Sequence, residues 1–152
     1  MRRLLFIGLL LATALVAAPV ARASDDSVRA VVKAQAERQI KEDKKFEKAV
    51  KKLSTKAQLK KARTATKKQR VSIETFKQAL AVERADSAKV KKGRREMLDA
   101  LNLYDKGLNK FHTALTQAIN DGGSDGEAKA RSAIKNMNTA VRRVYNAAKK
   151  IG

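Results

Sequence analysis

His112 is the single histidine of this 152-residue chain, and its imidazole is the first side chain to consider for metal binding or proton transfer. A helix-borne histidine that binds a metal usually has further ligands at helical spacing, but neither His-x-x-x-His nor Glu-x-x-His occurs. Met97 or Met137 would be the axial partner in a haem bundle, yet the covalent attachment motif is absent. Leu108 and Leu115 lie about one turn away on either side, so we expect a histidine at the edge of an apolar core, with no metal and no cofactor.

The carboxylates are few and do not suggest a catalytic pair. General acid–base catalysis needs two carboxyl groups that converge in a cleft. Glu42, Asp43 and Glu47 alternate with lysines, a pattern typical of ion pairs on a helix surface, and Glu96 and Asp99 form a second small group. Cysteine is absent and no serine lies in a nucleophile motif, which excludes thiol chemistry and disulfides. We therefore expect no catalytic residues and no enzymatic activity.

Lysine and arginine are the residues with a functional interpretation. The chain has 35 of them against 15 aspartates and glutamates, a formal net charge of +20. The segment 41–70 alone holds 13 basic and 3 acidic residues. The expected anion-binding residues lie on the outer faces of two successive helices and at the junction with a third: Lys44, Lys45, Lys48, Lys51, Lys52, Lys60, Lys61, Lys67, Lys68, Lys91, Lys92, Arg94 and Arg95.

A surface of this kind has two interpretations. It is either a solvated helix face that keeps the protein soluble or a site that holds a polyanion, and net charge alone does not separate the two. Because the aromatic residues fall mostly on core stripes, the surface would recognise backbone charge and not base sequence. The expected partner is an anionic polymer, an anionic lipid surface or an acidic protein, with self-association as an alternative. Sequence-specific nucleic acid is not expected.

The first 23 residues have the pattern of an export signal. Two arginines at positions 2 and 3 precede an apolar run over residues 4–20, and Ala21 and Ala23 occupy the small-residue positions before a cleavage site. The run is short for a membrane span, which needs about 20 apolar residues. We expect cleavage after Ala23, a secreted or periplasmic location, and a mature basic helical domain over residues 24–152 with a net charge of +17. An uncleaved signal anchor is the alternative.

The mature chain has a composition typical of an all-α fold. It contains no proline, residues that favour helices dominate it, and no alternating strand pattern of useful length occurs. The sequence predicts an elongated four-helix bundle with helices at about residues 27–53, 55–85, 88–120 and 125–151. The third and fourth helices have the most regular apolar stripes, so we expect them to form a helical hairpin.

The helix boundaries follow from capping residues and glycines. Acidic residues and serine at 25–27 are expected to cap the first helix, and residues 54–55 give a weaker turn signal before the second. Glycines 122–123 end the third helix, and Ser124 and Glu127 have the spacing of a capping box for the fourth. These glycines are therefore explained by a turn and not by a phosphate-binding loop.

The junction between the second and third helices has two interpretations. Asp86 or Ser87 can cap a new helix, which places a break near residues 85–88. However, an apolar stripe with a period near 3.5 residues crosses this junction, which fits one continuous helix over residues 55–120 and three helices in all. Such a helix would be close to 100 Å long, and ordinary helices are far shorter. We therefore favour the break.

The first helix has an incomplete apolar stripe. Gln35, Gln39 and Glu42 interrupt it, so this helix either extends past the core or meets a polar partner. From charge, export and the absence of catalytic motifs, we expect an exported, non-enzymatic helical protein that binds an anionic envelope or extracellular partner electrostatically. The alternative is a structural or oligomerising coiled-coil protein of the envelope, because an incomplete core invites a helical protein partner.

Overall fold

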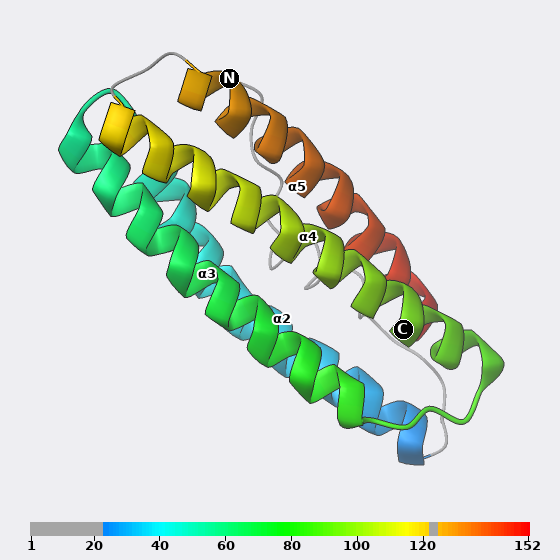
Figure 1. The fold of residues 1–152 in the computed structure, drawn as a ribbon. Coiled ribbons are helices and arrows are strands. Elements are labelled where there is room, and N and C mark those ends of the chain that lie inside the picture. Colours follow the sequence, from blue (N-terminus) through cyan, green and yellow to red (C-terminus); the bar gives the residue numbers. More distant parts are fainter. Residues whose placement is uncertain (1–22, 122–124) are drawn as a thin grey trace.

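The computed structural model of the chain describes residues 23–121 and 125–152, except for the side chains of Ala23, residues 125–128 and Arg131. Its four helices are α2 (Ala23–Val50), α3 (Lys56–Val82), α4 (Ala88–Asp121) and α5 (Asp125–Ile151). Each helix runs antiparallel to the one before it, and together they form the elongated bundle of Figure 1. The predicted all-α, four-helix fold is therefore confirmed. Residues 1–22 of the predicted export signal lie outside the part that the structure describes, as do Ser124 and the Glu127 side chain of the predicted capping box.

Two short connections divide the first three helices. Thr55 precedes α3 as its N-cap: its hydroxyl accepts a hydrogen bond from the Gln58 amide, and the Gln58 side chain accepts one from the Thr55 amide. This reciprocal capping box satisfies donors that the first helical turn leaves free. The chain then leaves the helical conformation over residues 83–87 before α4 begins. The predicted break near 85–88 is confirmed, and the continuous helix over 55–120 is wrong.

The start of α2 differs from the prediction. The helix begins at Ala23, four residues before the predicted start, so residues 25–27 lie inside it and do not form its cap. Asp25 is buried, and its carboxylate accepts hydrogen bonds from the backbone amides of Asp86 and Ser87, at 2.8 Å and 3.2 Å. It thus satisfies donors just before α4, while the Ser87 hydroxyl accepts from the Val90 amide. A carboxylate from one helix therefore helps to fix the start of another.

The interior is lined by positions that repeat every seven residues on each helix, the pattern of knobs-into-holes packing. On α4 the large buried side chains are Met97, Leu101, Tyr104, Leu108, Phe111 and Leu115. On α3 the buried positions are Ala62, Thr66, Gln69, Ile73, Phe76 and Leu80. In the sequence, apolar residues continue with a period near 3.5 residues across the 83–87 junction. In the structure, they lie on two antiparallel helices, α3 and α4, whose apolar sides face each other.

The α4–α5 pair has the most extensive contact in the bundle, and small residues make it possible. On α4 they are Gly93, Ala100, Gly107 and Ala114, and on α5 Ala133, Ala140 and Ala147, in each case seven residues apart. A Cβ atom on Gly107 would lie 2.6 Å from Cγ of Met137, and one on Gly93 would lie 2.9 Å from Cγ1 of Ile151. The predicted hairpin of these two helices is confirmed, and glycine allows its close approach.

A buried polar cluster occupies the middle of the α2–α3 contact. Asp43 is only 1% exposed and accepts hydrogen bonds from the side-chain amides of Gln39 and Gln69. The Ser72 hydroxyl donates to the side-chain oxygen of Gln39. Tyr104 of α4 packs close to Asp43, and burial together with the negative charge of Asp43 raises the pKa of Tyr104. The predicted surface role of Asp43 is therefore wrong. The interrupted stripe of α2 meets polar side chains of α3 within the same chain.

No helix among the described residues has the length and apolar character needed to cross a membrane.

Candidate anion-binding surface

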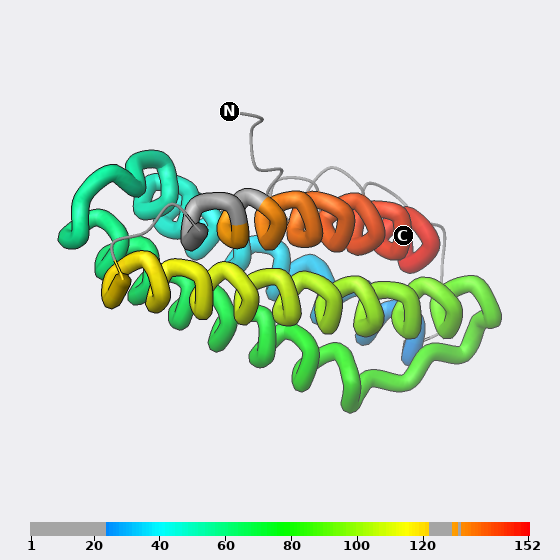
Figure 2. Tube along the Cα trace, turned by 45° about the horizontal axis from the view of Figure 1, so that its top comes forward, coloured from blue at the N-terminus to red at the C-terminus, as the bar shows by residue number. Residues whose placement is uncertain are grey.

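Nine of the thirteen predicted anion-binding residues lie on α2, α3 and the connection between them. They are Lys44, Lys45, Lys48, Lys51, Lys52, Lys60, Lys61, Lys67 and Lys68, and all nine are exposed. We call this set the α2–α3 basic surface. Figure 2 shows that it belongs to the hairpin end of the bundle, where the chain turns from α2 into α3.

The hydrogen bonds between α2 and α3 give the register of this surface. Gln69 contacts Asp43, and Ser72 contacts Gln39, so the two antiparallel helices place Lys45 level with Lys67 and Lys68. Because Ser72 faces α2, residues four and eleven positions before it, Lys68 and Lys61, lie on the same side of α3. Lysines of two adjacent helices thus border one seam.

The acidic residues near this surface hardly reduce its charge. Segment 41–70 contains three acidic residues, and burial of Asp43 leaves Glu42 and Glu47 as the acidic side chains that reach solvent. Glu42 forms a 2.7 Å ion pair with Lys45. This is the in-helix pairing that the sequence predicts, and such a surface pair contributes at most about 1 kcal/mol to stability. The surface therefore keeps a large excess of positive charge.

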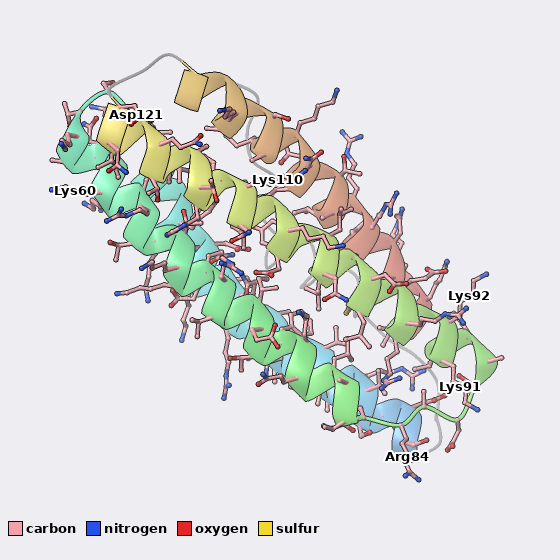
Figure 3. All side chains as sticks on the ribbon, viewed as in Figure 1. Lys60, Arg84, Lys91, Lys92, Lys110 and Asp121 are labelled. Carbon is pink, nitrogen blue, oxygen red and sulfur yellow. The ribbon has the colours of Figure 1, made fainter. Side chains whose placement is uncertain are left out.

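The other four predicted residues lie at the start of α4, at the opposite end of the bundle. Figure 3 shows Lys91 and Lys92 far from Lys60, and the length of α4 implies a separation of roughly 40 Å. The Arg94 guanidinium donates to the carbonyls of Leu80 and Ala81, so it closes the last turn of α3.

Acidic neighbours accompany this second cluster. Lys150 of α5 forms a 2.6 Å ion pair with Glu96, and Arg29 pairs with Asp26 near the same end of the bundle. Lys91, Lys92 and Arg95 are exposed. The structure thus divides the predicted residues into a dense group of nine lysines and a smaller, partly compensated group of four.

A shallow groove of about 300 Å³ continues the α2–α3 seam away from the hairpin end. It is lined by Gln35, Arg38, Lys41, Glu42, Ser72 and Thr75. Sequence reasoning did not include Arg38 or Lys41 in the candidate site. The signal that could have identified them is the spacing of Arg38, Lys41 and Lys45, which places three basic residues along one side of a helix.

His112 lies beside basic residues and not beside metal ligands. Its ring is partly buried, and Nε2 is buried with no hydrogen-bond partner among the described residues. Burial lowers the pKa of His112, and the positive charges of Lys67, Arg63 and Arg70 on α3 lower it further. Within the described ranges, no group of three or more histidine, aspartate or glutamate residues is arranged to hold a metal ion.

Arg70 illustrates how the α3–α4 seam is fixed. Its guanidinium forms a 2.9 Å ion pair with Asp105 and donates to the side-chain oxygen of Asn109, also at 2.9 Å. A second shallow groove runs beside these groups, past Lys106 and Lys110. Its polar side chains are largely paired or solvated, so it offers less uncompensated charge than the α2–α3 seam.

Comparisons of the chain with protein-family models, with curated proteins and with solved structures gave no match.

Proposed function

We propose that this is an exported, non-enzymatic helical protein that binds an anionic envelope or extracellular partner electrostatically through the α2–α3 basic surface. The observation that carries the proposal is the display of nine exposed lysines within segment 41–70, where Glu42 and Glu47 are the acidic side chains that reach solvent. Such a concentration of one charge attracts polyanions and raises their association rate. Export is supported by the signal pattern of residues 1–23.

The composition of the surface supports recognition of charge. Phe46 is the one aromatic residue of segment 41–70, and it packs edge-on against Phe111 in the core. The surface therefore has no ring on which a nucleobase could stack, and lysine is a point charge without the bidentate geometry of arginine. Backbone charge is what such a surface recognises, with an affinity that depends strongly on salt.

The experiment uses charge-matched variants of the mature protein. One variant replaces Lys44, Lys48, Lys60 and Lys67 of the basic surface with glutamine. The control makes the same charge change at exposed residues of α4 and α5: Lys106, Lys110, Lys135 and Arg142. Binding to heparin and to phosphatidylglycerol vesicles is measured between 50 and 300 mM salt.

We expect the surface variant to lose at least about tenfold in affinity at 100 mM salt, with a salt dependence reduced by about two to three in log–log slope. The control variant should lose much less. Binding that ignores salt, or that falls equally in both variants, would contradict a localised site. N-terminal sequencing of protein purified from its host tests the export step, which predicts Ser24 as the first residue.

A further inference from the structure

We infer that the α2–α3 seam is a linear track for a flexible phosphodiester chain, with Arg38 and Lys41 extending the basic surface into the groove. This inference rests on the proposed function and specifies the shape and chemistry of its ligand. We call the five residues Arg38, Lys41, Lys45, Lys61 and Lys68 the seam track. All five are exposed, and Val71, three residues after Lys68, is the one large exposed hydrophobic residue beside them among the described residues.

The α2 side of the track is a row of evenly spaced cations. Arg38, Lys41 and Lys45 follow one another at three and four residues, so they share a helix face. At a rise of 1.5 Å per residue, their mean spacing along the axis is about 5 Å. Arg38 and Lys41 are lining residues of the groove itself, which makes them accessible to a chain lying in the seam.

The α3 side supplies the second row. Lys61 and Lys68 lie seven residues apart, about 10 Å along the axis, on the side of α3 that Ser72 directs toward α2. Lys68 stands level with Lys45, and Lys61 lies beyond it toward the hairpin end. The whole track is therefore about 20 Å long. The five cations of the track can neutralise about five phosphates of one strand.

Glu42 places a negative charge beside the seam track, so its removal tests whether the ligand is an anion. Its carboxylate lines the groove and forms the 2.7 Å ion pair with Lys45, so it competes with a phosphate for that lysine. Ser72 and Thr75 line the same groove but direct their hydroxyl protons to Gln39 and to the Val71 carbonyl. The donors left for a phosphate in the groove are thus the cationic side chains and the side-chain amide of Gln35.

A chain fits this seam better than a lipid surface does. A flat bilayer would rest on the outermost lysine heads, and binding without apolar insertion then depends on the charges that reach the membrane plane. A single chain can instead enter the groove and contact both rows together. Phosphodiester chains occur as nucleic acid strands and as glycerol phosphate polymers, and the two sources are compared directly in the test.

The first measurement uses oligothymidylates of 2 to 12 nucleotides with the full mature protein. We expect the salt dependence of binding to steepen with length and to level off at about five phosphates, with a slope of roughly −3.5. Poly(glycerol phosphate) of matched charge distinguishes the second source. Whichever chain binds more tightly identifies the source, and either chain should bind more tightly per phosphate than phosphatidylglycerol vesicles.

The second measurement uses variants on the track. R38Q/K41Q should weaken binding of the 12-nucleotide chain by about three- to tenfold, with less than a twofold change for vesicles. The control variant K33Q/R142Q removes one lysine and one arginine from exposed positions away from the track, and it should change the binding of neither the chain nor the vesicles. E42Q should strengthen chain binding by about two- to fivefold, because it frees Lys45 and removes a like charge. Circular dichroism checks that each variant stays helical.

The outcomes separate the two proposals. If the quadruple lysine variant loses binding while R38Q/K41Q and E42Q behave like wild type, the track is wrong and the basic surface remains. Tighter binding per phosphate to vesicles than to chains, with no length dependence, also overturns the track. If no anion binds in a salt-dependent manner, both proposals fail.

Discussion

His112 lies in an environment that favours the neutral form of its ring. Its Nε2 is buried and has no hydrogen-bond partner in the part of the chain that the structure describes, and burial together with Lys67, Arg63 and Arg70 lowers its pKa. A protonated ring would have to place a charged N–H in the protein interior beside three positive side chains. The folded state therefore resists a proton that the unfolded chain binds readily near pH 6.5.

This difference predicts a loss of stability in mild acid. As the pH falls through about 6.5, the unfolded chain takes up the proton first, so the free energy of unfolding decreases. His112→Gln should abolish most of the change between pH 7.5 and 5.5, a window above the range in which carboxylates titrate. Urea unfolding of both proteins at the two pH values is the measurement. Equal pH dependence in the two proteins would show that His112 is not the group responsible.

Asp25 shows how a single carboxylate connects distant parts of the chain. Burial raises its pKa, but hydrogen bonds from the Ser87 hydroxyl and from the amides of Asp86 and Ser87 outweigh that effect and lower it. The ionised form is thus the one that the fold stabilises. Because the amides belong to the connection between α3 and α4, the carboxylate holds α2 against the start of α4.

We predict that Asp25→Ala lowers the free energy of unfolding by about 1–3 kcal/mol, because two backbone donors lose their acceptor. Asp26→Ala is the matched control. Asp26 is the exposed partner of Arg29 in an i,i+3 pair, so its loss should cost less than about 0.5 kcal/mol. Urea denaturation at pH 7 measures both, and similar losses in the two variants would contradict the role of Asp25.

Some side chains could not be placed from the sequence because their partners are distant along it. Asp43 lies in a lysine-rich segment and has the local pattern of a surface residue. It is nevertheless buried, and the side-chain amide of Gln69, 26 residues away, donates a hydrogen bond to it. Arg94 has the pattern of a surface cation, yet the carbonyls at the end of α3 accept its hydrogen bonds. Glu42 pairs with Lys45 as predicted because that contact is local.

At the level of helices, local signals were sufficient to predict most boundaries. Thr55 and Ser87 are capping residues next to regular apolar stripes, and the helices that follow them begin at Lys56 and Ala88. The start of α2 was predicted too late, because serine and acidic residues also fit inside a first turn. The small-residue repeat between α4 and α5 was missed, although the seven-residue spacing of Gly93, Ala100 and Gly107 was its visible signal.

The close contact of α4 and α5 predicts a strong effect at Gly107. A valine there would press on Met137, whose Cγ is 2.6 Å from the position of a Cβ atom, so we expect a loss of about 2–3 kcal/mol in unfolding free energy. Thr113→Val, at an exposed site of α4, should change stability by less than about 0.5 kcal/mol. Met137→Ala should recover part of the loss in the valine background. A double-mutant cycle with no coupling would contradict the contact.

For the whole molecule, the decisive feature is that the apolar stripes face one another within one chain. The buried polar cluster around Asp43 fills the part of α2 that lacks apolar side chains, so the core needs no second chain to complete it. Val71 and Val82 are the exposed large hydrophobic residues in the part of the chain that the structure describes. Isolated apolar residues of this kind are ordinary on a soluble surface.

A protein of residues 24–152 should therefore sediment as a monomer, and its net charge of +17 opposes self-association further. Sedimentation equilibrium from about 5 to 200 μM, at 150 mM and at 500 mM salt, tests this, since screening at the higher salt removes much of the repulsion. A concentration-dependent dimer at both salts would support the coiled-coil alternative instead. In that case V71K/V82K decides where the contact lies: a return to monomer would place it on the outer face of α3, beside the basic surface, where a second copy and a polyanion would compete.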